Sequence, residues 1–120
     1  MRPYKRTDRV GALIQQMLSE ILTKDIKDPR LQMATITGVK MTPDLKIAYI
    51  YFTISGVSEN KQRNEEASEG FKSALGYIKR TLATQLGLRY MPELKFFYDE
   101  SFEYGARIDL LLRNLEKKNE

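Results

Sequence analysis

Basic side chains gather around an Ala74-Leu75-Gly76 step in the stretch 64–93, whose apolar residues recur at the spacing of one long helix. A glycine inside a helix costs about 1 kcal/mol relative to alanine, so it indicates a close approach, a bend or a non-helical backbone there. Lysine and arginine bind phosphate groups, and they flank or follow this step at Lys72, Lys79, Arg80 and Arg89. The pattern predicts a helix–kink–helix that presents backbone and basic side chains to a polyanion.

The same residues have a purely structural explanation. Glu65, Glu66 and Glu69 precede the glycine and most of the cations follow it, an arrangement that complements a helix dipole. Packing of one helix against a sheet would equally explain the small residues Ala74 and Gly76. Charge and periodicity alone leave both interpretations open.

Three other arginines are candidates for phosphate contact. Arg6 and Arg9 belong to a basic N-terminus, in which residues 1–6 are expected to form an arm that either lies along phosphates or is frayed. Arg30 follows an Asp28-Pro29 turn, where it either pairs with an acid or contacts nucleic acid.

The chain contains neither histidine nor cysteine, which excludes imidazole acid–base catalysis, thiol nucleophiles, disulfides and the common transition-metal sites. Four carboxylates around the predicted third strand could hold magnesium in a nuclease: Glu93, Asp99, Glu100 and Glu103. Acids at the start of a helix need no such role, because they complement its dipole. We therefore expect no enzymatic activity, no metal and no other cofactor.

The composition is that of one globular domain. A chain of 120 residues, 42% hydrophobic and 30% charged, can bury roughly two-thirds of its unfolded surface. The net charge of +4 favours a polyanionic partner only modestly. The N-terminus lacks the apolar run of a signal peptide, and the longest apolar stretch, 47–54, is far shorter than the roughly 20 residues that span a bilayer. We expect a cytoplasmic monomer with no membrane or small-molecule partner.

Hydrophobic periodicity predicts the elements that position these side chains. A first helix spans 7–27 and ends at Asp28-Pro29. Strands 33–41, with a bulge at Gly38, and 45–55 are joined by a Thr42-Pro43-Asp44 turn and pair antiparallel. A third strand, 94–98, precedes a last helix and a short solvated tail, 116–120. The apolar positions of that helix are Ile108, Leu111, Leu112 and Leu115.

The second strand alternates between two faces. The residues expected to face the helices are Ala48, Ile50, Phe52 and Ile54. Tyr49, Tyr51 and Thr53 are expected on the other face. Exposed tyrosines there could stack nucleobases or bind a protein, although a second element covering them is the simpler expectation.

The order α-β-β-α-(kink)-α-β-α predicts an α+β fold in one domain, 1–120, with helices packed on one face of a three-stranded sheet. Two helices joined by a glycine-containing element, between a hairpin and a third strand, are the arrangement of KH domains, and the leading helix selects type II. KH domains clamp a nucleic-acid backbone with a GXXG loop between the helices. Ala74-Leu75-Gly76 replaces that loop here, so the generic clamp is not expected.

Several motifs, in order and spacing, resemble the bacterial ribosome-binding factor A family over nearly the whole chain. They are Lys27-Asp28-Pro29-Arg30-Leu31, Gly38-Val39, Met41-Thr42-Pro43-Asp44-Leu45, Ala74-Leu75-Gly76, Pro92-Glu93-Leu94, Phe96, Asp99, Ser101, Gly105, Arg107-Ile108 and Leu111-Leu112. That family has a KH-like fold with an Ala-x-Gly kink in place of GXXG.

The resemblance implies a non-enzymatic assembly factor that binds the free small (30S) ribosomal subunit, its 16S rRNA and neighbouring ribosomal proteins. Its implied role is late maturation of that rRNA, including the 5′-terminal helix, and the family is linked to growth in the cold. Gly76 would let the helix bend, and Ala74 would keep the elbow small enough for RNA to approach. The implied rRNA contacts are Lys72, Lys79, Arg80, Arg89, Arg30, Arg6 and Arg9.

Overall fold

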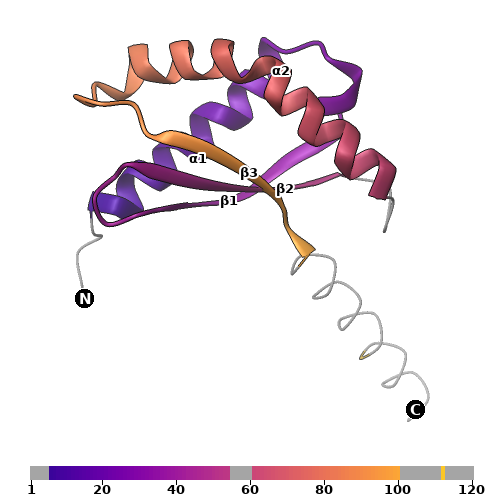
Figure 1. Cartoon of the computed structure of the whole chain (residues 1–120), viewed down its shortest axis with the longest axis horizontal. Coiled ribbons are helices and arrows are strands. Elements are labelled where there is room, and N and C mark those ends of the chain that lie inside the picture. The colour runs from indigo at the N-terminus through magenta and orange to yellow at the C-terminus, as the bar shows by residue number, and fades with distance from the viewer. Residues whose placement is uncertain (1–5, 55–60, 101–111, 113–120) are drawn as a thin grey trace.

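Two long helices and three strands account for most of the ordered backbone (Figure 1). The computed structural model describes residues 6–54, 61–100 and 112. In chain order the elements are helix α1 (Arg6–Lys24), 3₁₀ helix η1 (Pro29–Leu31), strands β1 (Ala34–Met41) and β2 (Ile47–Ile54), helix α2 (Lys61–Leu86) and strand β3 (Glu93–Tyr98). The predicted last helix and the tail 116–120 lie outside the described residues, apart from Leu112, which is helical and exposed.

Helix α1 packs most of its predicted apolar stripe against the sheet; the stripe comprised Val10, Leu13, Ile14, Met17, Leu18, Ile21, Leu22 and Ile26. Leu13 is the exception, since it is 39% exposed. The buried positions are Gly11, Ile14, Leu18, Ile21 and Leu22. The helix ends at Lys24, three residues before the predicted end. The Asp25 N–H still donates to the Ile21 carbonyl, at 2.9 Å, but the Ile26 N–H donates to that same carbonyl, at 3.1 Å and five residues back, which departs from the helical pattern. It begins at Arg6, which the sequence had placed in the N-terminal arm; the rest of that arm lies outside the described residues.

Strands β1 and β2 form the predicted antiparallel hairpin. Their register shifts between Ile36 and Gly38, which confirms the bulge. The turn that joins them is closed by the Asp44 carboxylate, which accepts from the Thr42 hydroxyl at 2.6 Å and the Lys46 N–H at 3.0 Å. These two hydrogen bonds, that of Thr42 foremost, lower the pKa of Asp44.

Helix α2 begins at Lys61 and ends at Leu86, where Gly87 adopts a φ of 63° and terminates it. It connects β2 to β3, which pair in parallel, so the sheet is mixed with the order β1-β2-β3. Within the described ranges, no helix is both long and apolar enough to cross a membrane.

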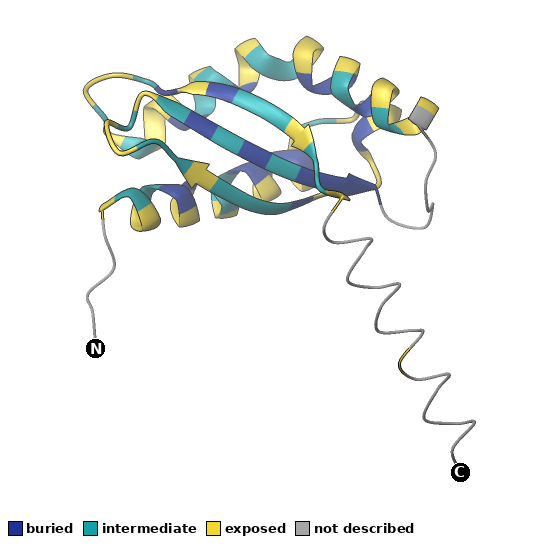
Figure 2. Ribbon diagram, turned by 60° about the horizontal axis from the view of Figure 1, so that its bottom comes forward, coloured by how far each residue is buried: buried dark blue, intermediate teal, exposed yellow. Residues whose placement is uncertain are grey.

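Both helices cover the same face of the sheet. Figure 2 looks onto the other face, where the three strands lie in front of the helices and no described element crosses them. The α+β layer predicted from the order of elements is therefore confirmed.

The core lies between the sheet and the two helices. The predicted inward residues of β2 are confirmed, with at most 7% exposure: Ala48, Ile50, Phe52 and Ile54. Phe71 of α2 stacks on Phe96 with ring centroids 4.4 Å apart. Thr53, which the alternation placed on the outer face, is buried, unlike the tyrosines predicted for that face. The Thr37 hydroxyl donates to Asp99 at 2.6 Å, from β1 to the end of β3, and this bond closes over that end of β2.

Candidate nucleic-acid interface

The middle of α2 carries the predicted elbow. Two helices were expected, but α2 is one helix from Lys61 to Leu86, and its ribbon changes direction near the middle (Figure 1). Gly76 has no positive φ, and a Cβ there would meet only a guanidinium nitrogen of Arg80, at 3.4 Å. A non-helical conformation and a close approach are both excluded, so a gentle bend explains the glycine.

The connection between α1 and β1 braces α2 on both sides of Gly76. Before it, Ser73 Oγ lies 3.4 Å from a guanidinium nitrogen of Arg30 in η1. After it, the Tyr77 hydroxyl donates to Asp25 at 3.0 Å. The bend is therefore held from outside the helix by two contacts to the segment that follows α1.

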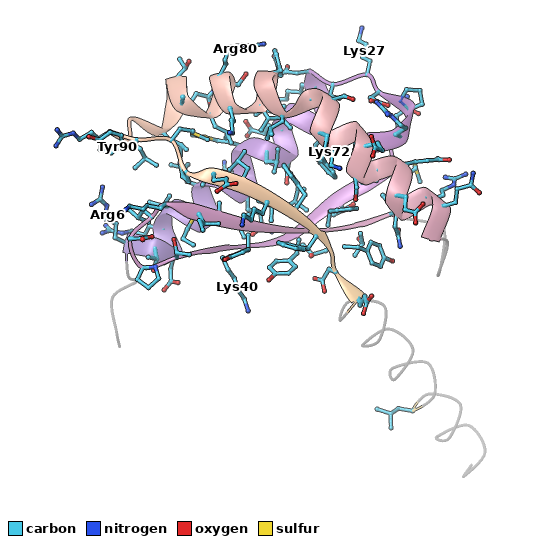
Figure 3. All side chains as sticks on the ribbon, in the orientation of Figure 1. Arg6, Lys27, Lys40, Lys72, Arg80 and Tyr90 are labelled. Carbon is cyan, nitrogen blue, oxygen red and sulfur yellow. The ribbon has the colours of Figure 1, made fainter. Side chains whose placement is uncertain are left out.

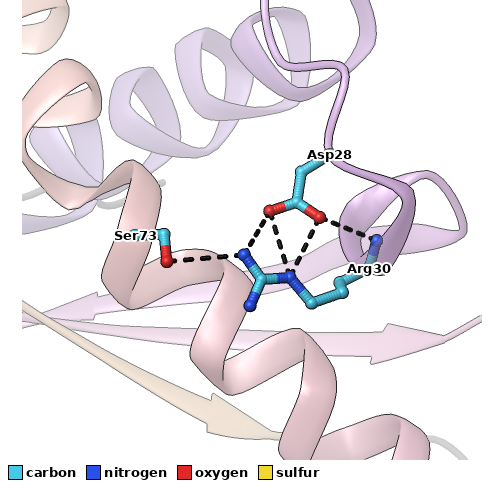
Figure 4. A network of polar contacts seen from close by, with 3 residues as sticks. All are labelled: Asp28, Arg30 and Ser73. Carbon is cyan, nitrogen blue, oxygen red and sulfur yellow. Dashed lines mark hydrogen bonds and ion pairs between the residues drawn. The ribbon is translucent and has the colours of Figure 1, made fainter.

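Arg30 pairs with Asp28 (Figure 4). Of the two roles predicted for Arg30, pairing with an acid and contact with nucleic acid, the structure bears on the first. Its Nη2 and Nε donate to the two carboxylate oxygens at 2.6–3.1 Å, and its backbone N–H donates to Oδ1 at 2.9 Å. The side-chain hydrogen bonds from Arg30, followed by the backbone one, lower the pKa of Asp28, and Asp28 in turn raises the pKa of Arg30. The pairing with an acid is confirmed, and a contact of Arg30 with RNA stays a prediction.

Three cations lie along α2 around the bend. Lys72 forms a loose 3.9 Å pair with Glu69, both side chains more than 60% exposed, so the pair leaves it available. Lys79 is half-buried and Arg80 exposed, and neither forms an ion pair with any described residue. Arg80 also lines a shallow depression of about 250 Å³ on the surface of α2, together with Tyr77, Thr81, Thr84 and Gln85.

The remaining predicted cations lie elsewhere. Arg89, in the loop after α2, places its guanidinium 5.4 Å from the ring centroid of Tyr90, which is 75% exposed. Arg6 and Arg9 are exposed in the first turns of α1. In Figure 3, Arg6 and Tyr90 lie toward one end of the molecule, whereas Lys72 and Arg80 lie nearer its middle. The predicted residues therefore form more than one basic surface.

Two features of the site were missed from the sequence. Tyr77, next to Gly76, follows the helical spacing of the exposed face and could have been found from it. Phe97 joins Tyr49 and Tyr51 on the uncovered sheet face, with ring centroids 6.0 Å away from each. The alternation of β3 places Phe97 outward, but its position beside β2 follows only from the parallel pairing.

The carboxylates proposed for a magnesium nuclease are not gathered into a site in the described part of the chain, where no group of acids could hold a metal ion. Asp99 accepts the hydrogen bond from Thr37, and Glu103 lies outside the described residues.

Comparison with known sequences identifies relatives along the whole fold. A profile of the family described as ribosome-binding factor A matches residues 6–112. The ribosome-binding factor A of Desulfatibacillum aliphaticivorans is 55% identical over 115 residues, 96% of this chain and 91% of its own. That of Desulfosudis oleivorans is 50% identical over 120 residues, all of this chain and 91% of its own.

Solved structures have the same fold. A ribosome-binding factor A protein from Thermotoga maritima matches with a TM-score of 0.70 and 27% identity, over 83% of this chain and 92% of that one. A homology model of the Thermus thermophilus protein, fitted into a cryo-EM map of a 30S–ribosome-binding factor A complex, matches with a TM-score of 0.62 over 78% of this chain and 96% of that one, at 21% identity. The profile match and the identity to these relatives show that this chain belongs to the ribosome-binding factor A family.

Proposed function

We propose that this protein binds the free small (30S) ribosomal subunit through the outer surface of bent α2. On it the protein assists late maturation of 16S rRNA, including the 5′-terminal helix. The observation that carries the proposal is the exposed surface after Gly76, where Arg80 and Lys79 have no acidic partner in the described chain. Family membership supplies the ribosomal partner, since one relative with this fold has been fitted into a 30S complex.

An uninterrupted α2 favours docking by side chains over clamping by the backbone. In a helix each interior N–H is bonded to the carbonyl four residues earlier, so none is free to bind phosphate. A GXXG loop acts differently, because it clamps the nucleic-acid backbone itself. The bent helix therefore suits a folded rRNA surface, with Ala74 and Gly76 keeping the elbow low and Lys72, Lys79 and Arg80 reaching phosphates.

Arg89, Arg6 and Arg9 extend this proposal to a second contact at one end of the molecule. The Arg89–Tyr90 pair offers a cation and an exposed ring together, which suits RNA. Arg30 remains a candidate contact, although two of its three guanidinium nitrogens, Nε and Nη2, already donate to Asp28. In this proposal the protein is a cytoplasmic monomer that acts by binding and not by catalysis. Its contribution to growth is greatest in the cold.

Co-sedimentation tests the proposal directly. We expect the protein to pellet with free 30S subunits and to be absent from complete ribosomes, and Lys79→Glu to reduce the bound fraction. Lys46→Glu is the matched control, since it reverses an exposed lysine of the hairpin, away from α2. In cells that lack the native protein, the wild type should remove 16S rRNA precursors with an unprocessed 5′ end. Equal pelleting with both particles, or equal effects of the two reversals, contradicts the proposal.

A further inference from the structure

No described element covers the sheet face away from the helices (Figure 2). Three aromatic rings gather on this face, those of Tyr49, Tyr51 and Phe97. Phe97 is 44% exposed, and its ring centroid lies 6.0 Å from those of both Tyr49 and Tyr51. The ring planes are tilted from one another by only 37° and 33°. The three rings therefore form one continuous aromatic surface, which we call the open-face platform.

Two lysines flank the platform at one end. In the register of the sheet, Lys40 of β1 and Lys95 of β3 are the direct partners of Tyr49, one on each side. Directly paired residues of one face lie about 5 Å apart, so both ammonium groups can reach past the edge of that ring. Neither lysine forms an ion pair with any residue among those described. Lys40 points away from the helices in Figure 3.

The middle of the platform is left open by a glycine. Gly38 is the register partner of Tyr51, and a Cβ at that position would meet no atom within 4 Å outside its own chain neighbours. The β1 side of the Tyr51 ring therefore has free space beside it. On this face, the carboxylates of the described residues lie beyond the ends of the rings, with Glu93 near Lys95 along β3 and Asp99 bonded to Thr37 at the other end.

We infer that the open-face platform is a second RNA surface, which stacks unpaired nucleobases on Tyr49, Tyr51 and Phe97 while Lys40 and Lys95 contact the phosphates. Rings on a sheet stack bases of any sequence, because every base has a π-face, and flanking cations track the backbone. Tyr49 and Tyr51 are half-buried and Phe97 is exposed, and no described residue pairs with the two flanking cations. Such a surface fits a single-stranded polyanion better than an apolar protein surface. The identification of this RNA as rRNA rests on the proposed function; the stacking surface itself does not.

Binding of a free oligonucleotide tests the platform on the intact protein. The probe is a fluorescein-labelled oligouridine of about ten nucleotides, measured by anisotropy. Tyr49→Leu and Phe97→Leu should each weaken binding about tenfold, because they remove a stacking ring. Tyr49→Phe is the matched control and should retain affinity, since it keeps the ring. The double variant Lys40→Glu, Lys95→Glu should weaken binding and flatten its salt dependence, whereas Lys46→Glu should not.

Cross-linking keeps the test valid if a leucine variant unfolds. With wild-type protein and an oligonucleotide that contains 4-thiouridine, we expect cross-links in 47–54 and 93–98. Cross-links confined to α2, or an affinity unchanged in folded Tyr49→Leu and Phe97→Leu proteins, would overturn the inference. The inference would also be overturned by a platform variant that binds the oligonucleotide normally but no longer binds a ribosomal protein that the wild type binds. The face would then be a protein-binding surface.

The two proposals fail separately. If Lys79→Glu leaves 30S co-sedimentation intact while the platform variants lose oligonucleotide binding, the α2 surface is wrong and the platform stands. If Lys79→Glu abolishes co-sedimentation while the platform variants bind the oligonucleotide as the wild type does, the platform is wrong and the α2 surface stands.

Discussion

The carboxylate of Asp28 accepts hydrogen bonds from the backbone N–H and from two guanidinium nitrogens of a single residue, Arg30. This pair stabilises η1 and places Arg30 where its guanidinium also reaches Ser73 of α2. Both side chains are partly exposed, so the contribution is that of a surface ion pair with good geometry. At the scale of the residue, then, Arg30 organises the turn under α2 before any ligand is bound.

Asp28→Asn separates the charge from the hydrogen bond, because asparagine can still accept the backbone N–H. At neutral pH we expect the thermal midpoint to fall by about 1–4 °C, the effect of losing a surface ion pair. The pKa of Asp28 is lowered by folding, so its stabilisation is present above the unfolded value of about 3.9 and is lost as pH falls through the folded value. The difference between variant and wild type should therefore shrink as the pH falls below the unfolded value. Thermal denaturation followed by circular dichroism measures it, and a constant difference across this range would show that charge is not the cause.

Helix α2 contains two glycines in different surroundings. A Cβ at Gly70 would lie 3.0 and 3.1 Å from the Cγ and Cδ2 atoms of Leu31, which is 2% exposed. A Cβ at Gly76 would meet only the end of the flexible Arg80 side chain, at 3.4 Å. At the scale of the element, one glycine serves the packing of η1 against α2, and the other serves the bend.

The two alanine substitutions should therefore change stability in opposite directions. Gly70→Ala gains about 1 kcal/mol of helix propensity but overpacks a buried leucine, which costs about 1–3 kcal/mol, so we expect a net loss. Gly76→Ala meets no such obstacle, so the free energy of unfolding should rise by up to about 1 kcal/mol. Urea denaturation measures both.

If the bend serves binding, Gly76→Ala should also weaken 30S association although it stabilises the fold. Straightening the helix would move Lys79 and Arg80 relative to Lys72. A variant that is more stable and binds as well as the wild type would show that the glycine is not needed for the contact.

The sequence predicted this element only in part. The apolar spacing placed six residues on one face: Ala67, Phe71, Ala74, Leu75, Ile78 and Leu82. Four of them are buried, and Ala74 and Leu75 are half-buried against the core. It could not show that the helix remains hydrogen-bonded through Gly76, because that depends on whether neighbours hold the bend. Ser73 and Tyr77 have such neighbours, Arg30 and Asp25, from a segment more than 40 residues earlier.

At the scale of the whole molecule, binding to rRNA should be governed by salt. If Lys72, Lys79, Arg80 and Arg89 each neutralise one phosphate, affinity should fall roughly 50- to 150-fold between about 50 and 200 mM salt. The double variant Lys79→Glu, Arg80→Glu should lower the affinity and reduce this slope. Its thermal midpoint should stay nearly unchanged, since neither cation has an acidic partner in the described chain. Filter binding at several salt concentrations measures the slope, and an equal loss of stability and affinity would identify the two residues as structural.

The sequence by itself determined most of the elements and most of the core. Burial of apolar side chains follows local periodicity, so the inward residues of β2, the hairpin with its bulge and the stripe of α1 were all predictable. Its motifs also determined the family. Only the tertiary structure decided which polar and aromatic groups meet: Arg30 with Asp28 and Ser73, Tyr77 with Asp25, and Phe97 with Tyr49 and Tyr51. Most of these contacts join segments far apart in the chain, and their partners are set by how α2 crosses the sheet and brings β3 beside β2, which no local pattern encodes.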